Sequence, residues 1–329
     1  MKNDRPKICT AEARANPVWR VLIMRSRLSM TEQVAFAFFA YMTVAAMVFH
    51  LAARDSCTII ALSATTLATL MVLRRNRQRA RWLAAAADLF PALLILVAYR
   101  ESGLLLTPDP THHLDLAFIR WDRLLLHNQF VVGVLRTASP WLQHYLEFAY
   151  LLCYSLVPLG VAAIHFTSRR GAPSETGNSA ASVGRGSGQA TDGFWIAVLL
   201  ATLFCFVLYP FFPLTPPRVL FGDVPGPHVE PLLRKWNFWL LDHYSVQACL
   251  FPSAHVAAVT AVALAVRRQA PRLGVLFLFF AASVAVATIY GRYHYAADAV
   301  AGALVGVAAY EASTALISIR LSRSKAPLC

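Results

Sequence analysis

Eight apolar runs, most of them long enough to cross a membrane as helices, constrain this chain more than any other feature. They cover residues 33–53, 56–73, 82–99, 141–166, 193–213, 252–267, 273–290 and 296–318. A transmembrane helix needs roughly 20 mostly apolar residues, and the sixth run is the shortest of the set. The chain is 57% apolar and only 14% charged, which is typical of a polytopic membrane protein rather than a soluble domain. We therefore expect an all-α, multi-pass membrane bundle of about eight transmembrane helices.

The net charge of +13 could indicate binding to nucleic acid, but the positions of the basic residues argue against it. If the N-terminus lies in the cytoplasm, 21 of the 30 Lys and Arg residues fall on that same side of the membrane. Their segments are 1–30, 74–81, 167–192, 267–272 and 319–329. This is the positive-inside pattern. It predicts a cell-membrane protein with both termini cytoplasmic, in contact with membrane lipids and not with nucleic acid.

A Gly/Ser-rich stretch at 167–192 divides the chain and predicts a flexible cytoplasmic linker. Before it we expect a cytoplasmic N-terminal segment, 1–32, and a four-helix membrane half, 33–166. After it we expect a second membrane half, 193–320, which holds the motifs described next. An amphipathic helix is expected at 111–127, in an outer loop whose acids, Asp109, Asp115 and Asp122, could recognise a polyol or amine headgroup.

Two short motifs each place a histidine where an apolar run begins, at the predicted extracytoplasmic face. In H-Y-A-A-D, His294 and Asp298 are four residues apart, so they share one face of a helix that begins there. A carboxylate bound to one imidazole nitrogen fixes the tautomer and leaves the other nitrogen to act as a nucleophile. The same pair could instead simply cap the helix at the membrane surface.

The second motif, F-P-S-A-H at 251–255, begins the preceding apolar run. Pro252 suits a first helical position, and Ser253 with the free N–H groups of the first turn forms a ready anion site. His255 then lies one turn into the helix, where it can donate a proton to a leaving oxygen. Upstream, P-L-T-P-P-R ends in Arg218, whose guanidinium matches phosphate oxygens, although a snorkelling arginine is the simpler interpretation of this motif alone.

The order and spacing of these residues resemble the type-2 phosphatidic acid phosphatase superfamily, which shares its helical core with vanadium haloperoxidases. That family has a basic motif, then P-S-x-x-H, then a motif ending in H-x-x-x-D. Here the last two are P-S-A-H at 252–255 and H-Y-A-A-D at 294–298. The resemblance covers residues 210–310, and it implies a phosphatidic acid phosphatase type 2-like core in the second membrane half.

The resemblance also implies roles for these residues. His294 would be the nucleophile that forms a phosphohistidine, and Asp298 would orient it. His255 would protonate the leaving group and then activate water or an acceptor hydroxyl. Arg218 and Ser253 would hold the phosphoryl oxygens. No metal and no cofactor are implied.

Two departures from the phosphatase pattern point to one branch of the superfamily. Six residues before the final histidine, where phosphatases have arginine, the chain has Thr288, and Arg292 lies much closer to His294. The proline-rich first motif and the third motif, which includes Tyr290, resemble inositolphosphotransferases such as inositol phosphorylceramide synthases. The run H-Y-A-A-D is also similar to the H-Y-T-x-D of sphingomyelin synthases. The resemblance therefore implies an enzyme that either hydrolyses a lipid-linked phosphate or transfers a phosphoinositol-type headgroup to a lipid hydroxyl, with Arg292 and Tyr290 as accessory residues.

Three other interpretations compete with this one. The two histidines and the aspartate could bind zinc, although their spacing is not that of a metal motif and a nearby arginine disfavours a cation. A transporter or channel could use titratable interfacial histidines, but it would need polar residues along its helices. A structural membrane scaffold would leave the histidine pair without a role.

Overall fold

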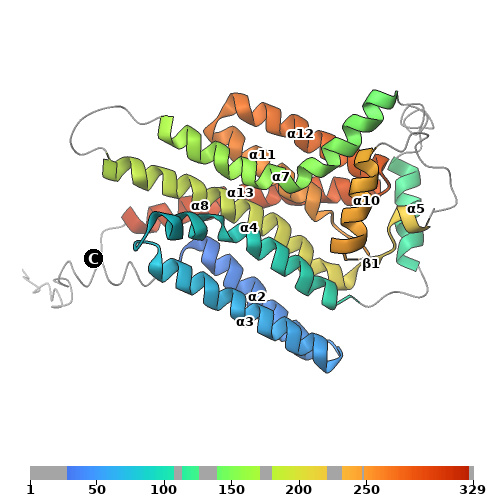
Figure 1. Cartoon of the computed structure of the whole chain (residues 1–329), viewed down its shortest axis with the longest axis horizontal. Helices are drawn as coiled ribbons and strands as arrows, with labels where there is room; N and C mark the ends of the chain where they lie inside the picture. The colour runs from blue at the N-terminus through green and yellow to red at the C-terminus, as the bar shows by residue number, and fades with distance from the viewer. Residues whose placement is uncertain are drawn as a thin grey trace, which may run out of the picture.

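The computed structural model describes residues 28–106, 113–125, 139–170, 180–220, 232–246 and 248–325, and this part of the chain is almost wholly helical (Figure 1). The long helices are α2 (Met30–Val48), α3 (Ala53–Asn76), α4 (Arg81–Leu104), α7 (Pro140–Arg170), α8 (Ala180–Leu208), α11 (Ala254–Gln269), α12 (Pro271–Tyr290) and α13 (Ala296–Lys325). The shorter elements are α5 (His113–Leu125), η2 (Tyr209–Phe211), β1 (Pro213–Leu214), α9 (Pro217–Leu220), α10 (Leu232–Tyr244) and β2 (Cys249–Leu250).

Seven of the described helices are long and apolar enough to cross a membrane: α2, α3, α4, α7, α8, α12 and α13. The predicted all-α, multi-pass bundle is therefore confirmed. The sixth apolar run differs from expectation, because it forms α11, which has only 16 residues. At 1.5 Å per residue α11 is about 24 Å long, shorter than the roughly 30 Å of a hydrocarbon core. The expected set of about eight spans is thus seven spans and one shorter helix.

The helix ends follow local capping signals. α2 begins at Met30, three residues earlier than expected, because Ser29 and Glu32 form a capping box in which each side chain accepts the other's backbone N–H. α7 continues to Arg170 and α8 begins at Ala180, so both helices enter the range predicted as linker. Residues 171–179 lie outside the described residues, as do residues 1–27 of the predicted N-terminal segment.

The short helix α11 lies at the centre of the C-terminal half, where it packs against α7, α8, α12 and α13. Most of its side chains are buried, which suits a helix whose sequence is apolar all round. Helices α2, α3 and α4 pack against one another, and α2 and α4 also contact α8 (Figure 1). Helices α2, α3 and α4 therefore flank a core bundle that is built around α11 and includes α7.

Two glycines let α13 approach α11 closely. A Cβ at Gly302 would lie 2.5 Å from the carbonyl oxygen of Ser253, and one at Gly306 would lie 2.6 Å from that of Ala257. The two glycines are four residues apart on one face of α13, the G-x-x-x-G spacing that brings membrane helices together. This contact matters for function because Ser253 belongs to the second motif.

Replacing Gly302 by leucine is expected to push α13 away from α11 and to lower the free energy of unfolding by about 1–3 kcal/mol. Thermal unfolding of the purified protein in detergent would measure the effect. Val300→Leu is the matched control, because Val300 is 49% exposed on the same helix, and it should change little. An unchanged melting temperature for Gly302→Leu would contradict the close contact.

The three sequence motifs gather at one end of the bundle. Figure 1 shows α5, β1 and α10 at that end and the C-terminus at the other. The short loop between α3 and α4 lies at the C-terminal end, together with the end of α13. This division separates the motifs from the basic segment 74–81, which the charge pattern assigned to the cytoplasm.

Candidate active site

Three backbone links join the three motifs. Strand β1 pairs with β2 in antiparallel register, Pro213 with Leu250 and Leu214 with Cys249, so the chain leading to the first motif lies beside the chain leading to the second. The N–H of Arg218 donates to the carbonyl of Arg292 at 3.0 Å, which links the first motif to the third. The N–H of Ser253 donates to the carbonyl of Asp298 at 3.2 Å, which links the second to the third.

His294 and Asp298 form a close pair at the start of α13. The distance from His294 Nδ1 to Asp298 Oδ2 is 3.4 Å, and the Asp298 side chain is fully buried. Asp298 Oδ2 also accepts the N–H of Tyr295 at 3.2 Å, so this carboxylate caps the helix as well as contacting the imidazole. One carboxylate therefore makes both the imidazole contact and the helix cap that the H-x-x-x-D spacing suggests. With Nδ1 engaged, Nε2 is the nitrogen that would attack an electrophile.

His255 faces the pair from the first turn of α11. The ring centroids of His255 and His294 are 5.7 Å apart, with the planes at 62°. His255 also lies against Tyr150 and Tyr154 of α7, with centroids 5.9 and 5.8 Å away. A phosphoryl group in contact with one histidine would therefore lie within reach of the other.

Ser253 is the N-cap of α11, and its Oγ accepts the N–H of Val256 at 3.5 Å. The residue is fully buried, and the Phe251–Pro252 peptide before it is cis. Since a hydroxyl both donates and accepts, capping leaves the proton of Ser253 able to donate to a phosphoryl oxygen. The first-turn N–H groups point out of the same helix end.

Arg218 lies in the short helix α9 and is half-buried. Its charge acts electrostatically on the phenol of Tyr154, the same side chain that contacts His255. This places the charge of Arg218 within electrostatic range of one neighbour of His255. Its position follows from its backbone, since Pro216 and Pro217 stiffen the approach and Arg292 anchors the Arg218 N–H.

The turn before His294 holds the remaining candidates. Arg292 has φ 58°, in the left-handed region that few non-glycine residues adopt. Its carbonyl oxygen accepts the hydrogen bond from the Arg218 N–H. Thr288, at the position where phosphatases have arginine, is fully buried, and its carbonyl accepts the N–H groups of Tyr293 at 2.9 Å and His294 at 3.1 Å. The phenol oxygen of Tyr290 is buried with no hydrogen-bond partner among the described residues.

A family model described as the PAP2 superfamily matches residues 116–312, which is more than half of the chain and includes all three motifs. The chain belongs to the PAP2 superfamily. No curated protein and no solved structure matches it. The match confirms the superfamily that the motifs resemble. Together with the helical structure, it also confirms the predicted fold class. The matched region begins inside α5 and ends inside α13.

In this PAP2 superfamily member, a buried ionic cluster supports the residue that precedes the predicted nucleophile. Glu147 of α7 accepts hydrogen bonds from Arg234, Asn237 and Tyr293, each at 2.7 Å. All four side chains are buried, and Tyr293 also stacks on Tyr150 at 3.9 Å between centroids. No local pattern in the sequence connects Glu147 with these partners, because they lie 87 and more positions away.

Two further acids differ from their predicted role. Asp115 accepts the N–H of Thr215, and Asp122 accepts that of Ala297, so both bind backbone of the motif loops rather than facing an open headgroup site. The third acid of that prediction, Asp109, lies outside the described residues. Among the described residues, no group of three or more His, Cys, Asp or Glu side chains is arranged to hold a metal ion.

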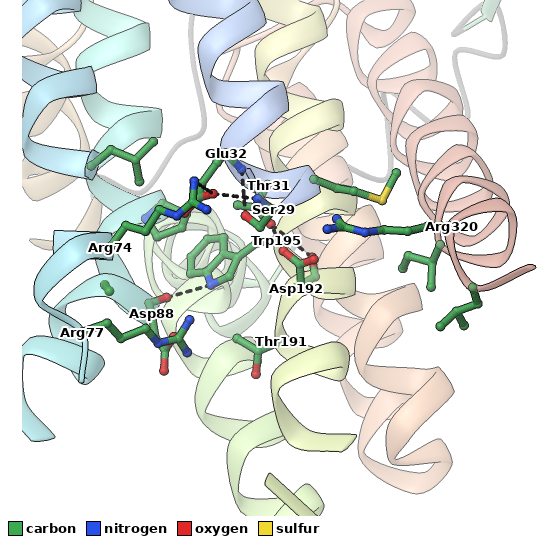
Figure 2. Close-up of a pocket in the computed structure, with 16 residues that line it drawn as sticks. Ser29, Thr31, Glu32, Arg74, Arg77, Asp88, Thr191, Asp192, Trp195 and Arg320 are labelled. Carbon is green, nitrogen blue, oxygen red and sulfur yellow. Dashed lines mark hydrogen bonds and ion pairs between the residues drawn. The ribbon is translucent and has the colours of Figure 1, made fainter. Parts of the chain in front are cut away.

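Away from the motifs, a cavity of about 470 Å³ is lined by residues of α2, α3, α4, α8 and α13 (Figure 2). Four of its charged residues form two ion pairs: Arg74 with Glu32 at 3.1 Å, and Arg77 with Asp88 at 2.6 Å. Trp195 also donates to the Asp88 carbonyl at 2.8 Å. These contacts tie the ends of α2, α3, α4 and α8 together.

Proposed function

We propose that the chain is an integral membrane enzyme that cleaves a lipid-linked phosphoryl group through a phosphohistidine on His294. The observation that carries this proposal is the geometry of three side chains: His294 engaged by a buried carboxylate, with the His255 ring 5.7 Å away at a helix N-terminus. Membership of the PAP2 superfamily, which generally contains phosphatases, favours an enzyme over a transporter or a scaffold.

In the first step His294 Nε2 attacks phosphorus, and the bond from phosphorus to the lipid oxygen breaks. Burial, with a contribution from His294, lowers the pKa of His255 to about 3, so His255 takes up a proton only when the anionic phosphoryl group is bound beside it. It then gives that proton to the departing oxygen, so an alcohol leaves and phosphohistidine remains. Asp298 stabilises the positive charge that develops on the imidazole. Arg218, the Ser253 hydroxyl and the N–H groups of the first turn of α11 stabilise the negative charge on the phosphoryl oxygens.

In the second step His255, now neutral, takes a proton from an attacking hydroxyl group. Oxygen bonds to phosphorus, the bond from phosphorus to nitrogen breaks, and His294 is regenerated. Water as the attacking group gives hydrolysis, whereas a lipid alcohol gives headgroup transfer. The third motif, H-Y-A-A-D, with Thr288 in place of arginine, supports the inositolphosphotransferase branch. We therefore propose a phosphoinositol-type headgroup as donor and a lipid hydroxyl as acceptor, with Arg292 and Tyr290 as accessory residues.

Incubation of the purified protein with a panel of labelled phospholipids, with and without ceramide or diacylglycerol, tests the proposal. Release of phosphate or of a phosphorylated headgroup in the absence of acceptor would indicate hydrolysis. A new labelled lipid that forms only with acceptor would indicate transfer. The assays are run in excess EDTA, because the proposed charge stabilisation uses protein groups alone. The proposal would be rejected if activity required added zinc or magnesium. It would also be rejected if no lipid gave any product.

We also propose that the histidine pair lies at the extracytoplasmic face and that both termini are cytoplasmic. Lys235 is exposed on α10 at the motif end, and Gln78 is exposed in the loop between α3 and α4 at the other. In a background without native cysteines, Lys235→Cys is expected to react with an impermeant thiol reagent on intact cells, and Gln78→Cys only after lysis. The reverse pattern would place the site in the cytoplasm.

A further inference from the structure

Helix α5 lies outside the apolar bundle, beside the loops that carry the motifs (Figure 1). It presents two carboxylates to them. Asp115 Oδ1 accepts the N–H of Thr215 at 2.8 Å, and Asp122 Oδ1 accepts the N–H of Ala297 at 3.1 Å. These acids are seven residues apart, or about two helical turns, so they lie on one face of α5.

The two backbone groups that they hold lie next to the proposed catalytic residues. Thr215 begins T-P-P-R, and because Pro216 and Pro217 have no N–H, the Thr215 N–H is the last backbone donor before Arg218. Ala297 lies in the first turn of α13, directly before Asp298, where N–H groups have no partner within the helix. Each carboxylate of α5 therefore fixes one loop of the site.

Two further contacts join these loops to each other and to the second motif. The Tyr295 hydroxyl donates to the carbonyl of Thr215 at 3.1 Å, so the first and third motifs are cross-linked where Asp115 also binds. Between the two acids, Phe118 is buried, and its ring lies 4.9 Å from that of Phe251 and 5.8 Å from that of Tyr295. One face of α5 thus contacts all three motif segments.

We propose that α5 is a positioning element, in which Asp115 holds the phosphate-binding loop of Arg218 and Asp122 holds the nucleophile loop of His294 and Asp298 at a fixed separation. This inference rests on the proposed function and adds two residues to it. Neither acid touches substrate in this account. Each acts through the backbone that it binds, and a displacement of about 1 Å in such a loop is enough to cost about 10²-fold in rate.

The electrostatics of Asp122 agree with a role other than stabilising the fold. Burial, with a contribution from the negative charge of Asp298, raises the pKa of Asp122 to about 6 despite its backbone hydrogen bonds. As pH rises from the usual aspartate range to above 6, the unfolded chain ionises first, so the folded state loses relative stability. At pH 7.5 both the folded and the unfolded chain have ionised Asp122, so the whole of this loss of folded-state stability is present. Asp122→Asn, which removes the charge and keeps an acceptor oxygen, is therefore not expected to lower the melting temperature.

The two acids predict different kinetic effects in the full-length protein. Asp122→Ala is expected to lower kcat by about 10–100-fold with KM nearly unchanged, because it displaces the nucleophile. Asp122→Asn, which keeps an acceptor oxygen, should recover most of that loss. Inorganic vanadate, which can be five-coordinate like the phosphoryl transition state, is expected to inhibit the enzyme. Asp115→Ala is expected to raise both KM and the vanadate inhibition constant by about tenfold, because it releases the Arg218 loop. Arg123→Gln, an exposed change on the same helix, is the control.

Wild-type kcat and KM in both alanine variants would overturn the inference. So would a kcat loss that merely follows a lower melting temperature, because that would indicate a structural role. A wild-type protein that neither turns over any lipid nor binds vanadate would instead reject the proposed function, and the inference with it. An active wild type with unaffected variants rejects only the role of α5.

Discussion

The His294→Ala protein is expected to lose turnover by about 10³-fold or more while it still inserts into the membrane and folds. His294 is the only side chain in the proposed mechanism that bonds to phosphorus, so no neighbouring residue replaces it. His255→Ala should lose activity to a similar extent, since the leaving alcohol would depart without a proton. The double variant should be little worse than either single variant, because groups that act as a unit are not additive. Steady-state turnover of the lipid substrate measures all three.

His294→Ala leaves the fully buried Asp298 carboxylate without its imidazole partner, which could destabilise the protein. His294→Gln is therefore measured beside it, because its amide can still donate to the carboxylate. His50→Ala is the matched control, since His50 is exposed and belongs to no motif. Near-normal turnover in His294→Ala or in His294→Gln would reject the nucleophile assignment.

Asp298→Asn is expected to reduce kcat by about 10³-fold with little change in KM. An amide at this position can still cap α13 through its oxygen, so the backbone link from Ser253 to residue 298 should survive. It lacks the negative charge that stabilises a positively charged imidazole, and it no longer fixes the tautomer. The effect should therefore appear in the chemical step and not in substrate binding.

The melting temperature of Asp298→Asn and its vanadate inhibition constant distinguish catalysis from structure. Both are expected to stay close to those of the wild type. A kcat within about threefold of the wild type would show that Asp298 acts mainly as a helix cap. A large rise in the vanadate constant would indicate instead that the anion site itself had been disturbed.

The sequence predicted the motif residues because their chemistry depends on short spacings. The four-residue spacing of His294 and Asp298 places them on one helical face, and the structure has them in contact. The N-cap at Ser253 likewise depends only on residues next to it in the sequence. The position of this cap also explains why α11 is short. The helix cannot begin before Ser253, and the next helix, α12, begins directly after Ala270.

The supporting residues could not be predicted in this way. Asp115 meets Thr215 across 100 positions and Asp122 meets Ala297 across 175, so their contacts depend on how α5 docks. No local pattern distinguishes these acids from others in the same outer loop. Glu147 and Arg234 likewise meet only after α7 and α10 have packed. Sequence reasoning found the reacting groups, whereas tertiary packing determines the groups that position them.

The most direct test of the phosphohistidine mechanism is to trap the intermediate. The purified protein is mixed with a lipid labelled in its phosphate, quenched within milliseconds to seconds, and mapped by mass spectrometry. The account predicts an acid-labile, alkali-stable label on the peptide that contains His294, absent from the His294→Ala protein. A label on another residue, or rapid turnover with no labelled protein at any time point, would contradict it.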